Sequence, residues 1–326
     1  MDTMARTLKR IGPGLLAILG LAAGALAARR MSVPSHAGFL VLAIGEIALA
    51  LVAFAPREIG AAFAQAFRRP LRDGQEWLAR QFWESAARNA CVLGALGAFV
   101  GLVVLFSTTE GLRDVDRALG ERLLGPWLGG ILLAALLAIP ALRASTAAAD
   151  GAFVRQPAAP PVQSLSVGLG YALFAAMLAF LLLAPGTRPG FEPSAWLLRG
   201  PAWLAVAGGA LAIVLYLGDR RRGRSATLAL AVAGLVAAVL GLLQALHGFA
   251  LSRITSVAAG ITFLLSACVA TLVGLGAVAL PLEDRERRLD GAAPLRLVWY
   301  GLPIVTMLLL AAAVALTLTP MAQRGG

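Results

Sequence analysis

Nine separate apolar runs, each about long enough to cross a lipid bilayer, constrain this chain more than any other feature. They cover approximately 11–28, 37–55, 91–107, 124–142, 164–184, 201–217, 226–247, 255–281 and 297–319. A transmembrane helix needs roughly 20 apolar residues. Only 14% of the 326 residues are charged and the mean hydropathy is +0.82, values unlike those of soluble domains. We therefore expect an all-α, polytopic membrane bundle of about nine transmembrane helices.

The arginines predict how these helices are oriented, because Lys and Arg are retained on the cytoplasmic side of short loops. With the N-terminus inside, the cytoplasmic segments hold 19 Lys and Arg and the opposite segments hold 9, which together make up all 28. This distribution predicts a cytoplasmic N-terminus and an external C-terminus. It also accounts for the net charge of +11 as an orientation signal with contact to membrane lipid. No motif for binding nucleic acid accompanies the charge.

The first span also has features of a cleaved signal peptide. Lys9 and Arg10 precede a short apolar core, which ends in a small-residue sequence at Ala25-Leu-Ala27. Arg29 and Arg30 directly afterwards would oppose export of a cleaved chain. These flanks favour a retained span, and cleavage remains the alternative.

Two spans recur later in the chain. Gly94–Leu102 (GALGAFVGL) matches Gly234–Leu242 (GLVAAVLGL), and Phe39–Leu51 matches Trp203–Leu215. Both matches join spans that are four apart, and such spans cross the membrane in the same direction. The sequence therefore predicts two tandem four-helix units, residues 1–150 and 164–290. A linker over 151–163 joins them, and residues 291–326 form a ninth transmembrane helix with a short tail.

Small residues at three- and four-residue spacing let membrane helices approach closely. The recurring glycines are therefore candidates for helix packing whatever the protein does. The two cysteines, Cys91 and Cys268, lie in separate spans without the spacing of metal ligands, and we interpret them as small buried apolar residues.

The repeated stretch resembles the MotA/TolQ/ExbB family, the membrane scaffold subunits of proton-driven stator and energy-transducing complexes. The penultimate span of that family carries a pattern similar to 94–102 and 234–242. Gly274–Pro281, Leu137–Pro140 and the pair Gly260-Ile261 are similar to parts of its last span. The step Phe54-Ala-Pro56 resembles the point where a MotA-type second span enters the cytoplasm. The resemblance implies a bacterial inner membrane location and a homo-oligomer.

The resemblance also implies a set of candidate pore or helix-packing positions. A pore-facing threonine of the family falls on alanine in both units, and a methyl group cannot hydrogen-bond water or a proton-carrying carboxylate. Thr271, or less directly Ser266 or Thr262, would supply a hydroxyl in the eighth span. The candidate positions are Gly94, Gly97, Ala98, Gly101, Gly234, Ala238, Gly241, Thr271 and Gly274.

The cytoplasmic segment between the second and third spans, 56–90, is shorter than its counterpart in MotA-type proteins. It contains a helix candidate over 75–88, in which Trp77, Phe82 and Trp83 lie mainly on one side. This helix is interpreted either as an interfacial helix under the lipid headgroups or as a docking surface for a cytoplasmic partner.

Glu46, near the middle of the second span, is the strongest candidate for a functional polar group inside the membrane. It either relays protons along a wet seam or hydrogen-bonds a neighbouring helix as a protonated acid. The ninth span contains no Asp or Glu. If the chain works as the family does, a single-span membrane partner must therefore supply the intramembrane acid.

The sequence contains no nucleophile and base pair, phosphate-binding loop or metal-ligand cluster, so we expect no enzyme activity, cofactor or metal. The leading hypothesis is a scaffold that packs around a partner's single transmembrane helix, with or without proton flow. The alternatives are a small-molecule transporter and an accessory polytopic membrane protein.

Overall fold

The computed structural model describes residues 36–67, 76–108, 125–149, 164–182, 198–218 and 222–290, and over these residues the secondary structure is helical, with no strand. The expected first and ninth spans, 11–28 and 297–319, lie outside the described residues. The helices are α2 (His36–Ala53), α3 (Pro56–Phe67), α4 (Glu76–Thr108), α6 (Gly125–Ala149), α7 (Ser164–Leu182), α9 (Gly200–Leu217), α10 (Arg222–Ala250), α11 (Ile254–Gly274) and α12 (Leu280–Asp290).

Three described segments are long and apolar enough to cross a membrane: Gly200–Leu217, Ser225–Ala250 and Thr255–Glu286. The pair Val41–Ala53 and Pro56–Ala66 is a fourth candidate, bent by 116° at its break. The apolar parts of α6 and α7 are shorter. The described residues thus show a helical protein with three candidate membrane-spanning segments, or four if the bent pair is one span. The count of nine spans stays a prediction.

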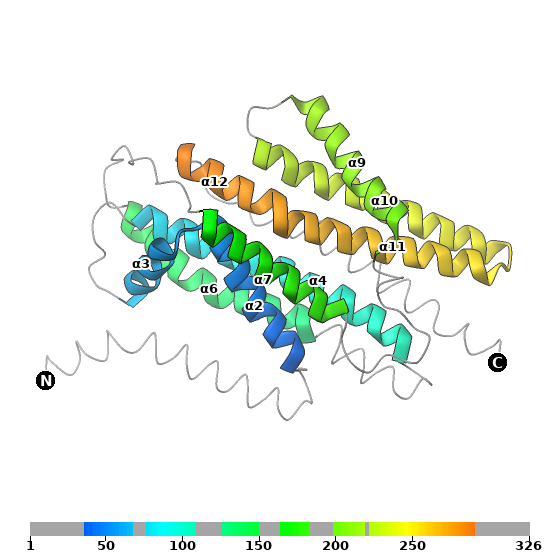
Figure 1. Cartoon of the computed structure of the whole chain (residues 1–326), viewed down its shortest axis with the longest axis horizontal. Helices are drawn as coiled ribbons and strands as arrows, with labels where there is room; N and C mark the ends of the chain where they lie inside the picture. The colour runs from blue at the N-terminus through cyan, green and yellow to red at the C-terminus, as the bar shows by residue number, and fades with distance from the viewer. Residues whose placement is uncertain are drawn as a thin grey trace, which may run out of the picture.

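The helices associate mainly as long antiparallel neighbours (Figure 1). The most extensive contacts join α4 to α6 and α10 to α11, α7 lies along α2, and α9 packs on α10 and α11. The two halves of the chain meet where α4 packs against α11 and where α2 packs against α7 and α12. Their shared apolar core includes Leu49, Leu96, Phe99, Leu265 and Leu272.

The bend after α2 has a local cause. Proline fixes φ and lacks an N–H, so it is suited to the first turn of a new helix and not to the interior of an old one. Pro56 accordingly begins α3, and the Glu58 carboxylate accepts a hydrogen bond of 2.8 Å from the Ala55 N–H at this start.

The expected helix over 75–88 is the first part of α4 and not a separate element. The 33 residues of α4 rise about 50 Å at 1.5 Å per residue, well beyond the roughly 30 Å apolar core of a bilayer. Phe82 and Trp83 are buried and stack edge to face on each other, and both contact Phe63 of α3. Trp77 is half-buried. The chain's own α3 therefore covers part of this aromatic side.

A second difference lies at the end of the eighth span. Helix α11 continues through a π-helical stretch, Leu275–Ala279, directly into α12, so the helix extends past the expected end near residue 281 to Asp290. A π-helical turn shifts the phase of the residues that follow it. Here the carboxylates of Glu283 and Asp284 lie inside the bundle, and the next subsection describes their partners.

Several glycines occupy the close contacts between helices. A Cβ atom on Gly94 would lie 2.8 Å from the Cα of Gly130, and one on Gly241 would lie 2.6 Å from the backbone nitrogen of Leu264. Gly234 faces the side chain of Thr271 at a distance that leaves no room for a Cβ atom. In these places the absence of a side chain sets the separation of α4 from α6 and of α10 from α11.

Candidate functional site

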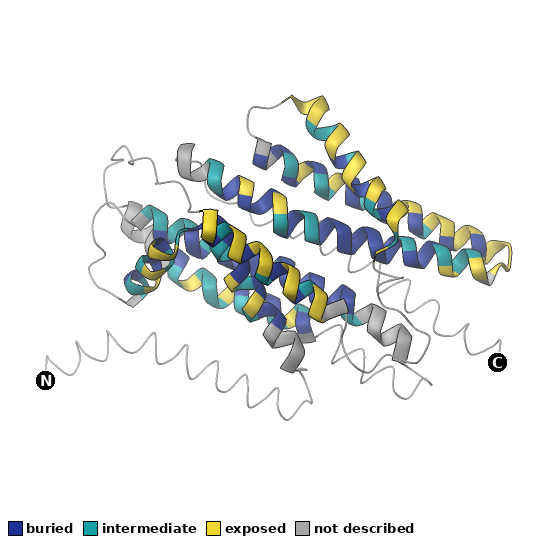
Figure 2. Ribbon diagram, viewed as in Figure 1, coloured by how far each residue is buried: buried dark blue, intermediate teal, exposed yellow. Residues whose placement is uncertain are grey.

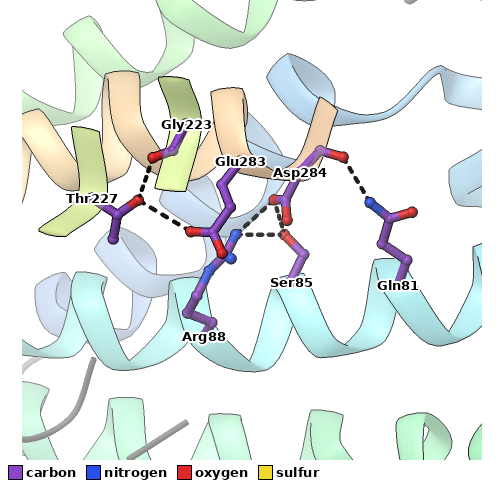
Figure 3. A network of polar contacts seen from close by, with 7 residues as sticks. All are labelled: Gln81, Ser85, Arg88, Gly223, Thr227, Glu283 and Asp284. Atoms are coloured by element: carbon purple, nitrogen blue, oxygen red, sulfur yellow. Dashed lines mark hydrogen bonds and ion pairs between the residues drawn. The ribbon is translucent and has the colours of Figure 1, made fainter. Parts of the chain in front are cut away.

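A cluster of buried polar groups lies where α4 and α10 begin and α12 continues the eighth span (Figure 3). We call it the polar cluster, and it consists of Gln81, Ser85, Arg88, Gly223, Thr227, Glu283 and Asp284. Residues far apart in the sequence meet in it. Buried polar groups need hydrogen-bond partners to offset the loss of water, so their arrangement is constrained.

The centre of the polar cluster is an ion pair between the two halves of the chain. Nη2 of Arg88 lies 2.6 Å from Oδ2 of Asp284, and both side chains are 2% exposed. Ser85 donates its hydroxyl to the same oxygen over 2.5 Å, and Gln81 donates to the backbone carbonyl of Asp284 over 2.7 Å. Ser85 and Arg88 are one helical turn apart on α4, which places both on the side facing α12. The Asp284 carboxylate therefore fixes α12 against α4.

The neighbouring Glu283 connects α12 to α10. Thr227 donates to a carboxylate oxygen of Glu283 over 3.1 Å and to the Gly223 carbonyl over 2.9 Å. The Gly223 N–H donates to Glu286 over 2.7 Å. A Cβ atom on Gly223 would overlap the backbone of Glu283, so only glycine permits this approach. Consecutive residues of α12 thus bind two different helices.

A third connection runs from α12 to the end of α2. The guanidinium of Arg285 donates to the Val52 carbonyl over 3.1 Å. Carbonyls in the last turn of a helix have no partner within the helix, so a cation there satisfies one of them and interacts favourably with the helix dipole. Residues 283 to 286 together hold α2, α4 and α10 at one end of the bundle.

Glu46 lies deeper along α2, on the side facing α4. It is half-buried and within electrostatic range of Arg88 and Cys91. Its Oε1 is buried and has no hydrogen-bond partner among the described residues. The structure therefore brings the candidate acid from the sequence close to the ion pair, although Glu46 forms no salt bridge with Arg88 in the described part of the chain.

The candidate pore or packing positions lie in the interior of the described bundle. Ala98 and Ala238 are fully covered and belong to the shared apolar core. Thr271 is fully buried and donates its hydroxyl to the Ala267 carbonyl over 2.8 Å, as helix threonines commonly do. The chain's own side chains surround all three. Around them, Gly97 faces the ring of Pro126, Gly274 faces Leu230, and Gly101 is half-buried.

The sequence interpretation missed Arg88, Ser85, Glu283 and Asp284 because it assigned them to cytoplasmic segments. A charged residue beside an apolar run normally indicates the membrane surface. One available signal was the placement of Ser85 and Arg88 one turn apart directly before the third span, matched by acidic residues directly after the eighth.

The polar cluster braces helices against one another. It contains no cysteine or histidine, and the described residues include no group of three His, Cys, Asp or Glu side chains that could hold a metal ion. Its hydrogen bonds run between helices, and they hold the two halves of the chain together at one end.

Comparison with known proteins adds no family assignment, since no family model and no curated protein or solved structure matches the chain significantly.

Proposed function

We propose that the chain is a membrane scaffold subunit similar to the MotA/TolQ/ExbB proteins, which packs around a partner's single transmembrane helix. It works without enzyme activity, spans the bacterial inner membrane about nine times, and has its N-terminus in the cytoplasm. The partner supplies the intramembrane acid, and proton movement along it is coupled to mechanical work or transport.

The polar cluster carries this proposal. A scaffold that bears force needs its helices fixed relative to one another. Here one short segment, Glu283–Glu286, binds three other helices across both halves of the chain. The long helix α4 extends the braced region beyond the thickness of the bilayer. MotA-type proteins likewise place part of the chain in the cytoplasm between the second and third spans, so the resemblance and the brace support the same function.

The interior of the described bundle supports a scaffold over a transporter. Substrate sites of transporters lie near the middle of the membrane, at interrupted helices with polar residues. In this chain the described spans meet through small apolar residues such as Ala98 and Ala238, and the polar cluster lies at one end. A partner helix, by contrast, needs only an apolar surface with small residues.

Affinity purification from native membranes tests this function. The tagged chain is expected to retain a small protein with one transmembrane helix that carries an Asp or Glu within the span. An unrelated polytopic membrane protein with the same tag is the control. Purification of the chain with lipid alone, under conditions that keep it folded, would contradict the proposal.

Glu46 favours a second candidate, a proton-coupled transporter, because its buried Oε1 has no hydrogen-bond partner among the described residues. Glu46→Gln removes the titratable proton and keeps the shape. The scaffold proposal predicts equal proton flux for wild type and Glu46→Gln when each is reconstituted alone in liposomes, because the proton-carrying acid belongs to the partner. The partly exposed Glu84→Gln is the control. A proton flux through the wild-type chain alone that Glu46→Gln abolishes would instead identify a transporter.

A further inference from the structure

The two predicted units correspond in their helix contacts as well as in sequence. Gly94 corresponds to Gly234, and the sequence Leu137–Pro140 aligns with the end of Gly274–Pro281 at the proline, which makes Thr271 the counterpart of Gly130. In the structure Gly94 contacts Gly130, and Gly234 contacts Thr271. Corresponding residues therefore meet in both hairpins, which supports the alignment of α4 with α10 and of α6 with α11.

Under this alignment, one face of α4 is buried and the same face of α10 is exposed. The α4 residues Val92, Leu96, Phe99 and Val100 are at most 4% exposed. Their counterparts in α10 are Val232, Val236, Val239 and Leu240, which are between 38% and 55% exposed. Figure 2 shows the resulting yellow positions along α10.

The second half of the chain covers the buried face of α4 by means of α11. The reciprocal contact, α10 against α6, has no comparable extent among the described residues. The two units therefore meet through different surfaces, which is a heterologous interface. Such an interface leaves one surface of each kind uncovered by the described part of the chain, and these surfaces can bind further copies.

The second surface that the described residues leave uncovered lies on α6. Val269, Leu272, Gly276 and Leu280, which are buried in the eighth span, correspond to Leu128, Ile131, Ala135 and Ile139 of α6. All four α6 residues are exposed, and their spacing places them on one side of the helix. This side of α6 thus repeats the surface with which the second half covers α4.

Helices α2 and α9 show the same difference. Gly170 of α7 packs against Ala48 and Val52 of α2. The counterparts of these two residues in α9 are Ala212 and Tyr216, and both are exposed.

We propose that a second copy of this chain covers the exposed face of α10, and that it does so with its α6. Each copy then contacts the next copy in the same way that the second half of one chain contacts its own first half. This association deepens the scaffold function by naming the surface through which the subunits assemble.

The contact between copies differs from the contact within a chain, because it has no ion pair. Leu228 is the counterpart of Arg88, and Arg143 is the counterpart of Asp284. No opposite charges meet at this position, so apolar packing supplies the contact between copies. Detergents compete with apolar packing in membranes, and we expect copies to separate in harsh detergent while each chain stays intact.

Cysteine crosslinking in membranes tests the arrangement, starting from a chain in which Cys91 and Cys268 are changed to alanine. The double variant L228C/R143C, treated with a short bis-maleimide, is expected to give dimers and larger products. The single variants are expected to give none. The positive control is R88C/D284C, which replaces the ion pair and is expected to link within one chain.

Two results would overturn the proposal. One is a dimer from L228C alone, because it would mean that α10 faces α10. The other is an absence of products from L228C/R143C when R88C/D284C reacts, because lipid alone would then cover the face. Neither result concerns the partner helix, whose copurification tests the scaffold function separately.

A pair of tryptophan variants provides an independent readout. Lipid accepts a bulky apolar side chain, whereas a packed contact between proteins does not. Val236→Trp on α10 is therefore expected to reduce the mass of the assembly in nanodiscs to that of a single copy. Ala176→Trp, at an exposed position of α7, is expected to leave the mass unchanged. Equal masses for the two variants would contradict the proposed surface.

Discussion

Arg88→Ala is expected to destabilise the folded protein by about 3 to 5 kcal/mol, because it leaves the Asp284 carboxylate buried without its cation. The side chains are both 2% exposed, and the two residues are 196 positions apart in the sequence. Unfolding in detergent, followed by circular dichroism, measures the loss. Asp284→Ala is expected to give a loss of similar size, since it leaves the guanidinium buried.

Two matched variants separate the buried ion pair from a general effect of lost charge. Arg80 and Glu84 form an ion pair on the same helix, but their side chains are 31% and 21% exposed. Exposed pairs contribute little, so Arg80→Ala is expected to cost less than about 1 kcal/mol. The double variant Arg88→Met with Asp284→Leu is expected to recover most of the stability, because it removes both buried charges. An equal loss from Arg80→Ala and Arg88→Ala would contradict this account.

Gly94→Ala is expected to destabilise the contact between α4 and α6 by roughly 1 to 3 kcal/mol, as overpacking of a close contact does. The added Cβ would lie 2.8 Å from the Cα of Gly130 and 2.9 Å from the Pro126 carbonyl oxygen. Both neighbours are backbone atoms, so the helices themselves must move apart. The temperature of unfolding in a mild detergent measures the effect.

Gly168→Ala is the matched control, since a Cβ atom at this helical position would have no neighbour within 4 Å. Alanine has the higher helix propensity, so this variant is expected to be as stable as wild type or more stable by up to about 1 kcal/mol. An unchanged unfolding temperature for Gly94→Ala would contradict this account, because it would mean that the close approach of α4 and α6 does not require a glycine at this position.

The sequence predicted the type and place of the described helices because apolar length is a strong signal in membrane proteins. Seven of the nine expected spans overlap described helices over most of their length, and the glycine spacing indicated close helix contacts. The ends of α4 and α11 were predicted less well. Charged residues at these ends indicated the membrane surface. In the structure these residues are buried with polar partners, and the helices continue through them.

The polar cluster was beyond the reach of a single sequence for a physical reason. Arg88 and Asp284 compensate each other only in the folded chain, and neither shows locally that the other will be near. Glu46 was easier to find, because an acid in the middle of an apolar run costs several kcal/mol and is therefore conspicuous. Its proximity to Arg88 depends on how α2 packs against α4, which periodicity alone does not determine.

The exposed face of α10 also could not be recognised without the structure. Val232 and Val236 are as apolar as the α4 residues that they resemble, so the sequence does not distinguish a face covered by protein from one covered by lipid. Only the structure shows that Val92 and Leu96 of α4 are buried whereas Val232 and Val236 of α10 are exposed.

The mass of the complex purified from native membranes in nanodiscs tests the central claim most directly. The scaffold account predicts an assembly that contains several copies of this chain together with a small single-span protein that carries an intramembrane acid. A single copy, surrounded by lipid and without such a partner, would contradict the account.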